Sequence, residues 1–230
     1  MLTVRSVVSS LLSLTLAGCA SNTLLSEVTT AVFRQYMGRA TDITTNAPLN
    51  PAYRYLKVDV PGKSSAILVL GYVDAHAQGD IQVWYSAQGE VLKTQQGRIV
   101  GTAGLEVDWL AVRFPSAPPD WSQVTQQTTS YTRVRDEMPS YRYSITEQIK
   151  MEAMSERPAI LLSSTFLLNT AIQYEWVRES VIASTVQALP PSWYAFVAHK
   201  NKRRLVYSYQ CLSAQLCLSV QPWPVEGAPV

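Results

Sequence analysis

The chain has few of the residues on which catalytic and metal sites most often depend. Its 230 residues include two histidines and three cysteines. His76 and His199 have no ligand-type spacing with the cysteines, so no metal site is expected. The sequence also lacks the Gly-x-Ser-x-Gly turn that presents a nucleophilic serine, and it has no glycine-rich phosphate loop opening a helix. We therefore predict no cofactor, and neither serine catalysis nor nucleotide binding is supported.

A strong excess of charge is lacking as well. Nineteen lysines and arginines against seventeen acidic residues give a net charge of +2. Nucleic-acid binding proteins neutralise phosphates with a basic surface, so nucleic acid is not expected as a partner. The dense basic run Lys202-Arg203-Arg204 is interpreted as a solvated turn.

The apolar stretch 7–17 is too short to cross a bilayer, which takes about 20 residues. It follows the basic residue Arg5 and ends in Leu16-Ala17-Gly18-Cys19, which resembles the lipobox of bacterial lipoproteins. The resemblance implies cleavage before Cys19, acylation of its thiol, and a lipid anchor. Because Ala20 rather than Asp follows, the outer membrane is the expected destination. The alternative is an ordinary secretory signal with a chance cysteine.

The other two cysteines, Cys211 and Cys217, lie six residues apart. In an exported protein they meet an oxidising compartment where disulfides persist. The five residues between them suit a hairpin loop whose flanking strands bring the two cysteines face to face. We predict a disulfide, with two free buried thiols as the alternative.

The predicted organisation is a signal peptide over 1–18, a lipid-anchored linker with a short helix over 19–48, and a single domain over 49–230. Apolar residues over 24–37 have near-helical spacing, whereas from Tyr53 onward the period is two. Short segments with strand signals are separated by turn residues and lie at 53–60, 66–73, 81–86, 90–94, 98–101, 106–114, 130–137, 141–151, 160–168, 171–182, 193–198, 205–211 and 216–220. The pattern predicts an all-β fold, an antiparallel β-sandwich or open barrel of many short strands.

Two of these segments carry more specific expectations. Strict alternation over 106–114 places Val107, Trp109, Ala111 and Arg113 on one face, and Asp108, Leu110, Val112 and Phe114 on the other. The segment 171–182 fits strand spacing, but helical spacing is also compatible with it.

Four segments, read in order, resemble the YjbF/GfcB family of outer-membrane lipoproteins that are encoded with exopolysaccharide and group 4 capsule export systems. They are Leu49-Asn50-Pro51-Ala52-Tyr53-Arg54-Tyr55-Leu56, Leu70-Gly71-Tyr72-Val73-Asp74, Val83-Trp84-Tyr85-Ser86-Ala87-Gln88-Gly89-Glu90-Val91-Leu92 and Gly97-Arg98-Ile99-Val100-Gly101-Thr102-Ala103-Gly104-Leu105. The later segment Val206-Tyr207-Ser208-Tyr209-Gln210 resembles the family's closing strand, with Tyr209 where a small residue is more usual. The resemblance implies an all-β protein without established enzymatic activity. It also implies an outer-membrane β-barrel export protein and a periplasmic accessory protein of the same system as partners.

Within these segments, Arg98 and Asp74 are candidates for a buried or half-buried ion pair. Glycoside hydrolysis needs two carboxylates at defined separations across a cleft. The available acids do not single out such a pair by their spacing: Asp74, Asp80, Glu106, Asp108 and Glu175. No catalytic residue is predicted.

The chain is rich in aromatic residues, with six tryptophans and twelve tyrosines. Trp84, Trp109 and Trp176 lie within predicted strands and are expected in the core. Trp121 and Trp223 lie near turns or prolines, and we name them as candidate glycan contacts, with core packing as the alternative. The leading hypothesis is a non-enzymatic accessory lipoprotein of polysaccharide secretion on the periplasmic face of the outer membrane. The alternatives are a carbohydrate-binding module that guides the polymer and, last, a polysaccharide-modifying enzyme.

Overall fold

The computed structural model describes residues 49–124, 128–159, 172–199 and 202–224. These residues form twelve β-strands and one short 3-10 helix, which confirms the all-β prediction. The strands are β1 (Tyr55–Asp59), β2 (Ala66–Asp74), β3 (Ile81–Ser86), β4 (Val91–Gln95), β5 (Arg98–Ala103), β6 (Asp108–Arg113), β7 (Thr129–Met138), β8 (Arg142–Met154), β9 (Glu175–Ser184), β10 (Ser192–His199), β11 (Lys202–Cys211) and β12 (Cys217–Trp223), and the helix is η1 (Trp121–Gln123). Residues 175–182 of the segment 171–182, for which helix and strand were both open, form most of β9.

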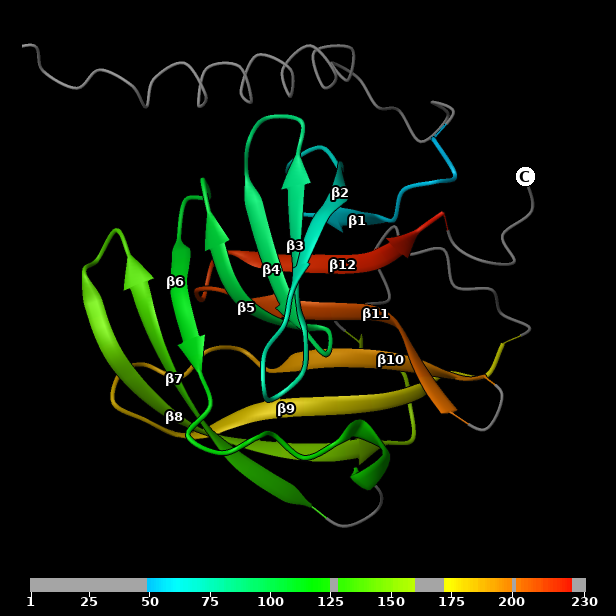
Figure 1. Cartoon of the computed structure of the whole chain (residues 1–230). Helices are drawn as coiled ribbons and strands as arrows, with labels where there is room; N and C mark the ends of the chain where they lie inside the picture. Colours follow the sequence, from blue (N-terminus) through cyan, green and yellow to red (C-terminus); the bar gives the residue numbers. More distant parts are fainter. Residues whose placement is uncertain (1–48, 125–127, 160–171, 200–201, 225–230) are drawn as a thin grey trace, which may run out of the picture. The chain divides into compact units, whose positions relative to one another are not determined.

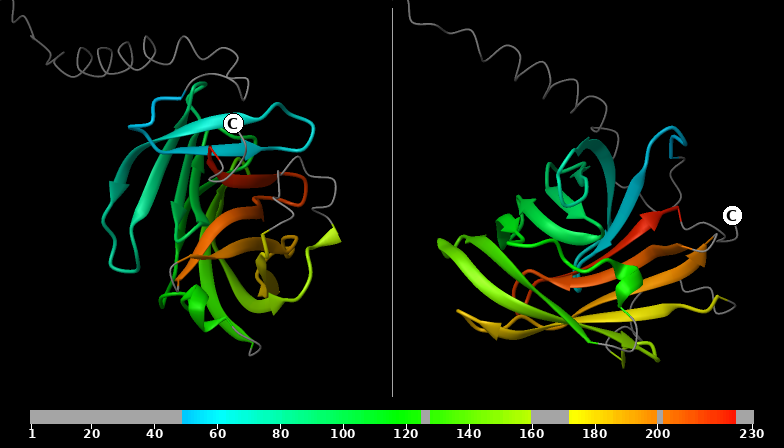
Figure 2. Two further views of the ribbon diagram at one scale, coloured as in Figure 1. Left: turned by 90° about the vertical axis from the view of Figure 1, so that its right-hand side faces the viewer. Right: turned by 60° about the horizontal axis from the view of Figure 1, so that its bottom comes forward.

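The strands make one antiparallel sheet in which nearly every strand pairs with its neighbour in the sequence. The order is β5-β4-β3-β2-β1-β12-β11-β10-β9-β8-β7-β6, so the first strand pairs with the last. Figure 1 shows β2 to β6 running crosswise in front of β9 to β12, with β7 and β8 curving between the two groups; Figure 2 shows these groups facing each other. The sheet is therefore a nearly closed barrel. Of the two predicted forms, a β-sandwich or an open barrel, the open barrel is the one observed.

The seam of this barrel lies between β5 and β6, the two edges of the sheet. Side chains join the edges there. The Trp109 backbone N–H donates to Thr102 Oγ1 at 3.0 Å, and the Asp108 carboxylate accepts from the N–H groups of Gly104 and Leu105 at 3.0 and 3.2 Å. These bonds satisfy backbone groups that an unpaired edge would otherwise expose.

The interior between the two groups of strands holds the apolar core. One cluster gathers around Trp84 and Trp109, and another around Tyr194 and Phe196. Trp84 and Trp109 retain 3% and 2% of their exposure, and Trp176 retains 4% in a third cluster with Ala195 and Tyr207. The core positions expected for the three strand tryptophans are confirmed.

A β-bulge overturns the strict alternation predicted over 106–114. The register between β6 and β7 shifts between Trp109 and Ala111, which leaves Leu110 49% exposed. Beyond the bulge, Val112 and Phe114 pack against the core on the side of Trp109 rather than opposite to it. The extra residue resets the period of two, so the faces assigned to the second half of the segment were wrong.

The disulfide prediction is confirmed. Cys211 ends β11, Cys217 begins β12, and the two pair directly across the hairpin and are joined through their sulfur atoms. The hairpin loop also contributes Leu212 and Leu216 to the core, at 0% and 5% exposure. The covalent link thus fixes the turn that leads into β12, the strand that pairs with β1.

Three predicted features lie outside the described residues: the anchor at Cys19, the helix over 24–37 and the strand over 160–168. The division into signal peptide, linker and domain stays a prediction. Within the described part of the chain, no helix has the length and apolar character needed to span a bilayer.

Candidate functional site

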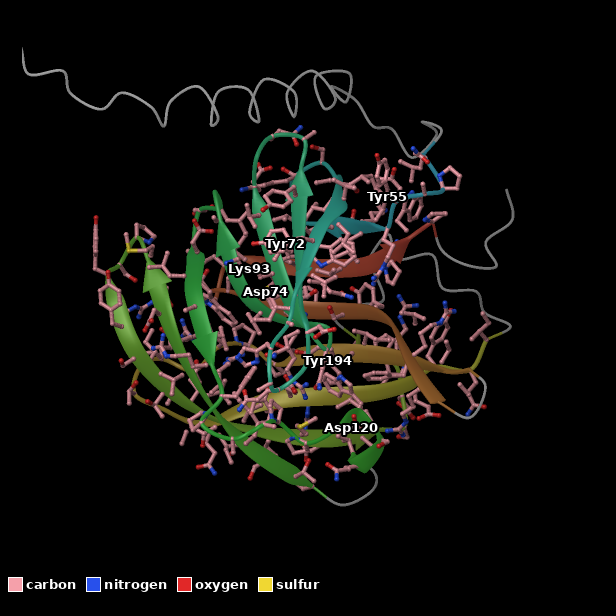
Figure 3. All side chains as sticks on the ribbon, viewed as in Figure 1. Tyr55, Tyr72, Asp74, Lys93, Asp120 and Tyr194 are labelled. Atoms are coloured by element: carbon pink, nitrogen blue, oxygen red, sulfur yellow. A yellow bond between two sulfur atoms is a disulfide. The ribbon has the colours of Figure 1, made fainter. Side chains whose placement is uncertain are left out.

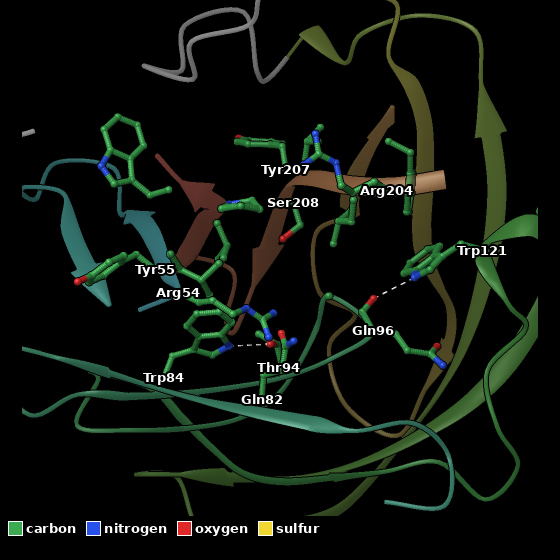
Figure 4. A pocket seen from close by; sticks show the side chains of 18 of the residues that line it. Arg54, Tyr55, Gln82, Trp84, Thr94, Gln96, Trp121, Arg204, Tyr207 and Ser208 are labelled. Atoms are coloured by element: carbon green, nitrogen blue, oxygen red, sulfur yellow. Dashed lines mark hydrogen bonds between the residues drawn. The ribbon is translucent and has the colours of Figure 1, made fainter. Parts of the chain in front are cut away.

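A large cavity opens at one mouth of the barrel, between β1, β3 and β4 on one side and β10 to β12 on the other. Its volume is about 1110 Å³. Figure 4 shows that aromatic rings, arginines and uncharged polar side chains line it together. The volume is slightly above the range of about 300–1,000 Å³ that small-molecule sites occupy. We call this space the mouth cavity.

The pairing of the first and last strands builds one rim of the mouth cavity. Tyr55 and Trp223 are direct partners in the ladder between β1 and β12, so their side chains share one face of the sheet. The Lys57 ammonium lies 5.5 Å from the centre of the Trp223 ring and 3.5 Å from the Asp59 carboxylate. Trp223 remains partly exposed. It therefore presents an aromatic surface beside the opening.

The opposite wall is formed by η1, which begins directly after Asp120. The Asp120 side chain accepts a hydrogen bond from the Ser122 N–H, and the Gln123 side chain accepts one from the Asp120 N–H, which is a capping box. The helix presents Trp121, whose Nε1–H donates to the Gln96 carbonyl oxygen at 2.9 Å. Trp121 therefore joins η1 to the turn between β4 and β5.

The faces of the Trp121 ring are largely occupied by other side chains. The Arg98 guanidinium lies 3.7 Å from the ring centre, and the rings of Tyr194 and Phe196 lie 4.7 and 5.1 Å away. Only 9% of the residue is exposed. Trp121 thus offers the mouth cavity an edge rather than a free stacking face.

The floor of the mouth cavity combines Trp84 with uncharged polar side chains. Trp84 Nε1–H donates to Thr94 Oγ1 at 3.0 Å, which fixes the indole ring. Gln82 lies beside them, and Ser208 of β11 lines the cavity on the opposite side (Figure 4). Arg54, just before β1, reaches across the floor with its Cζ 5.8 Å from the centre of the Trp84 ring (Figure 4).

Two charged residues of the lining are held by structural contacts. Arg203 donates to the carbonyl oxygens of Trp121 and Val124 at 2.6 and 3.0 Å, and it pairs with Glu175 at 2.6 Å. Hydrogen bonds from Ser122 hold the pKa of the Asp120 carboxyl below its usual value. A general acid in glycoside hydrolysis needs a raised pKa, so Asp120 is poorly suited to that role.

Behind Trp121 lies a buried ion pair that corrects the expected partner of Arg98. Arg98 pairs with Glu179 of β9, Nε to Oε1 at 2.9 Å, and both side chains are 4% exposed. The Tyr194 hydroxyl, labelled in Figure 3, lies 3.0 Å from the other oxygen of Glu179. Burial opposes the charge on Arg98, but the Glu179 carboxylate, together with Tyr131 and Tyr194, more than offsets burial and raises the pKa of the guanidinium. Asp74 instead lies exposed at the end of β2. The acidic partner of Arg98 comes from β9, in the opposite group of strands.

A second buried network lies on β7 and β8. Arg133 and Arg135 both contact the Glu147 carboxylate, which is 0% exposed, and both guanidinium groups stack on Trp109 at 4.8 and 5.2 Å. Arg135 also pairs with Glu137. These carboxylates are matched by arginines, which is the usual condition for burying charge. No group of three or more potential metal ligands occurs in the described part of the chain.

The carboxylates considered for glycoside hydrolysis are dispersed by the fold. Asp108 accepts backbone hydrogen bonds at the barrel seam, Glu106 faces Lys63 at the surface, and Glu175 pairs with Arg203. Asp80 lines the mouth cavity and Asp74 does not. The contacts of Asp108, Glu106 and Glu175 are therefore structural ones, and they do not bring two carboxylates together across a cleft.

The structure brings both candidate glycan contacts, Trp121 and Trp223, to the mouth cavity. Their glycan contact stays a prediction. The sequence reasoning missed Arg54, which stood only as one letter of a family segment. Arg54 lies next to Tyr55 in a segment of alternating residues, and that pattern does not mark it as a binding residue. The cavity that it lines forms only when β1 pairs with β12.

Comparisons with known proteins place the chain in context. The family model described as "Group 4 capsule polysaccharide lipoprotein gfcB, YjbF" matches residues 25–217. The crystal structure of the hypothetical lipoprotein YmcC from Escherichia coli (K12) is similar with a TM-score of 0.61 and 17% sequence identity, covering 86% of this chain and 97% of that one. At this identity the likeness concerns the fold. No curated protein matches the sequence.

Proposed function

The chain belongs to the group 4 capsule polysaccharide lipoprotein family, GfcB and YjbF, and from this membership we propose that it is an accessory component of exopolysaccharide or capsule polysaccharide secretion. The observation that carries the proposal is the family match over 25–217, preceded by a lipobox-like segment ending at Cys19. The role is non-enzymatic and positional. The protein is held on the periplasmic face of the outer membrane and docks to an outer-membrane β-barrel protein of the export system, with a periplasmic accessory protein as a further partner.

The lipid anchor supplies the physical basis for this position. Each buried acyl methylene contributes about 0.8 kcal/mol, so two or more chains on Cys19 make membrane attachment stable. The domain is then confined to the layer beneath the membrane, where its local concentration near other outer-membrane components is high. A weak contact with a barrel protein is sufficient under these conditions.

A cross-linking pull-down of the lipidated protein from membranes of polysaccharide-producing cells tests the proposal. We expect a large β-barrel protein to be captured, and we expect capture to be lost when Cys19→Ala removes the acylation site. A second bait with Arg113→Gln, a change at an exposed ion pair on β6, keeps the anchor and controls for surface substitution. Repeated failure of the anchored protein to capture any barrel protein under mild detergent would refute the docking role.

The mouth cavity favours a second candidate function, a carbohydrate-binding module that guides the polymer. Beside its charged residues, the lining holds aromatic rings and uncharged polar side chains, which are typical of sites that stack on sugar rings and bond their hydroxyl groups. Trp223 is the candidate stacking residue and Trp121 the candidate edge contact. Polysaccharide modification ranks last, since hydrogen bonds from Ser122 hold the pKa of Asp120 below its usual value and the other acids considered are dispersed.

A further inference from the structure

Arg54 stands out among the charged residues of the mouth cavity. It is exposed, and it makes no ion pair with any carboxylate that the structure describes. Arg203, by contrast, is bonded to Glu175 and to two carbonyl oxygens. The described contact of the Arg54 guanidinium is the face of Trp84. The Arg54 guanidinium thus lies in the cavity beside Trp84, with its N–H groups available to a ligand.

The surroundings of Arg54 match the chemistry of a sugar chain. Tyr55 and Trp223 are neighbouring partners in the β1–β12 ladder and both line the cavity. Gln82, Thr94 and Ser208 add polar groups to the lining (Figure 4). Guanidinium groups bind carboxylates through two parallel hydrogen bonds, a geometry that neutral sugars do not offer. The volume of about 1110 Å³ exceeds what a single monosaccharide needs and accepts a short stretch of polymer.

We propose that the mouth cavity binds a segment of the exported polysaccharide that carries carboxylate groups, with the Arg54 guanidinium on a carboxylate and the Trp223 ring beside the sugar. This inference rests on the proposed role in polysaccharide secretion and names the chemical class of polymer that the protein recognises. The uncharged polar groups of the floor bond hydroxyl groups, and the arginine selects acidic over neutral repeats.

The test uses the full lipidated chain in detergent and two probes. One is exopolysaccharide purified from the producing cells, and the other is the same polymer with its carboxylates chemically reduced to alcohols. We expect the native polymer to bind at least about tenfold more tightly than the reduced one, and Arg54→Gln to lose about the same factor. Raised salt weakens binding of the native polymer, since exposed charges are screened.

Arg113→Gln is the matched control, because it removes an exposed arginine that pairs with Asp136 on the β6–β7 side of the sheet. It should bind like the unchanged protein. Equal binding of both polymers, equal binding by Arg54→Gln, or no binding of the native polymer would each overturn the inference. Thermal unfolding of each variant shows that the fold is retained, as expected for changes at exposed residues.

The outcome separates this inference from the docking role. Arg54→Gln should still capture the barrel protein in the membrane pull-down. Capture without carboxylate-dependent binding overturns the inference alone, whereas carboxylate-dependent binding without capture overturns the docking role alone.

Discussion

Replacing Arg98 by methionine tests the reasoning about the barrel interior most directly. The substitution removes the cation that faces Glu179, and it leaves that carboxylate 4% exposed with the Tyr194 hydroxyl as its described hydrogen-bond partner. Removing one partner of a buried pair costs about 3–5 kcal/mol, because the other charge stays buried and uncompensated. For a domain of this size, that loss lowers Tm by about 6–20 °C.

Urea unfolding of the variant, followed by tryptophan fluorescence and circular dichroism, measures the loss of free energy. Adding Glu179→Gln to Arg98→Met removes both charges, and the double variant should recover more than half of the loss. The control is Arg113→Met, whose ion pair with Asp136 is shorter, at 2.6 Å, but has its arginine 52% exposed. Exposed pairs contribute about 0–1 kcal/mol. If Arg98→Met costs no more than this control, or if the double variant is no more stable than the single one, burial does not govern these ion pairs.

Three further changes probe other parts of the fold by unfolding experiments. Cys211→Ser opens the short disulfide loop to Cys217 and should lower the free energy of unfolding by about 2 kcal/mol. Adding reductant should not destabilise this variant further. Gly97→Ala should cost at least about 1 kcal/mol more than Gly89→Ala: both have positive φ, but a Cβ at 97 collides with a β11 side chain whereas one at 89 meets open space. Burial alone would raise the pKa of Glu137, but hydrogen bonds from arginines hold it below its usual value. Its stabilisation is complete above about pH 4.3 and is lost as the pH falls through the folded pKa, so Glu137→Gln should flatten acid unfolding below about pH 5.

Most strands were predictable because their signals are local. Alternation of apolar and polar residues, with turn residues between, located the segments that became β1 to β12, and the two cysteines flanking a short loop predicted their own pairing. The exception is the bulge at Leu110, which adds one residue to the strand. Nothing in the local sequence marks this bulge, so alternation placed Phe114 on the wrong side.

The ion-pair partners were not predictable, because they are set by contacts across the barrel. Arg98 and Glu179 lie 81 residues apart and meet only when the two groups of strands face each other. Asp74 is nearer in sequence but belongs to the same group of strands as Arg98. The same reasoning applies to Tyr55 and Trp223, which become partners through the pairing of the first and last strands.

The number of strands connects the fold to the mouth cavity. An eight-stranded barrel has an interior that side chains just fill, and the interior widens as strands are added. With twelve strands, the chain fills one part of the interior with tryptophans and arginine–glutamate networks, such as Arg133 and Arg135, which both contact the Trp109 ring and Glu147. Toward β1 and β12 no such network fills the space between the described residues, and the cavity remains. The wide interior therefore accounts both for the large polar residues inside the barrel and for its open mouth. Arg54, which forms no ion pair with a carboxylate of the described residues, lies where the packed part of the interior ends.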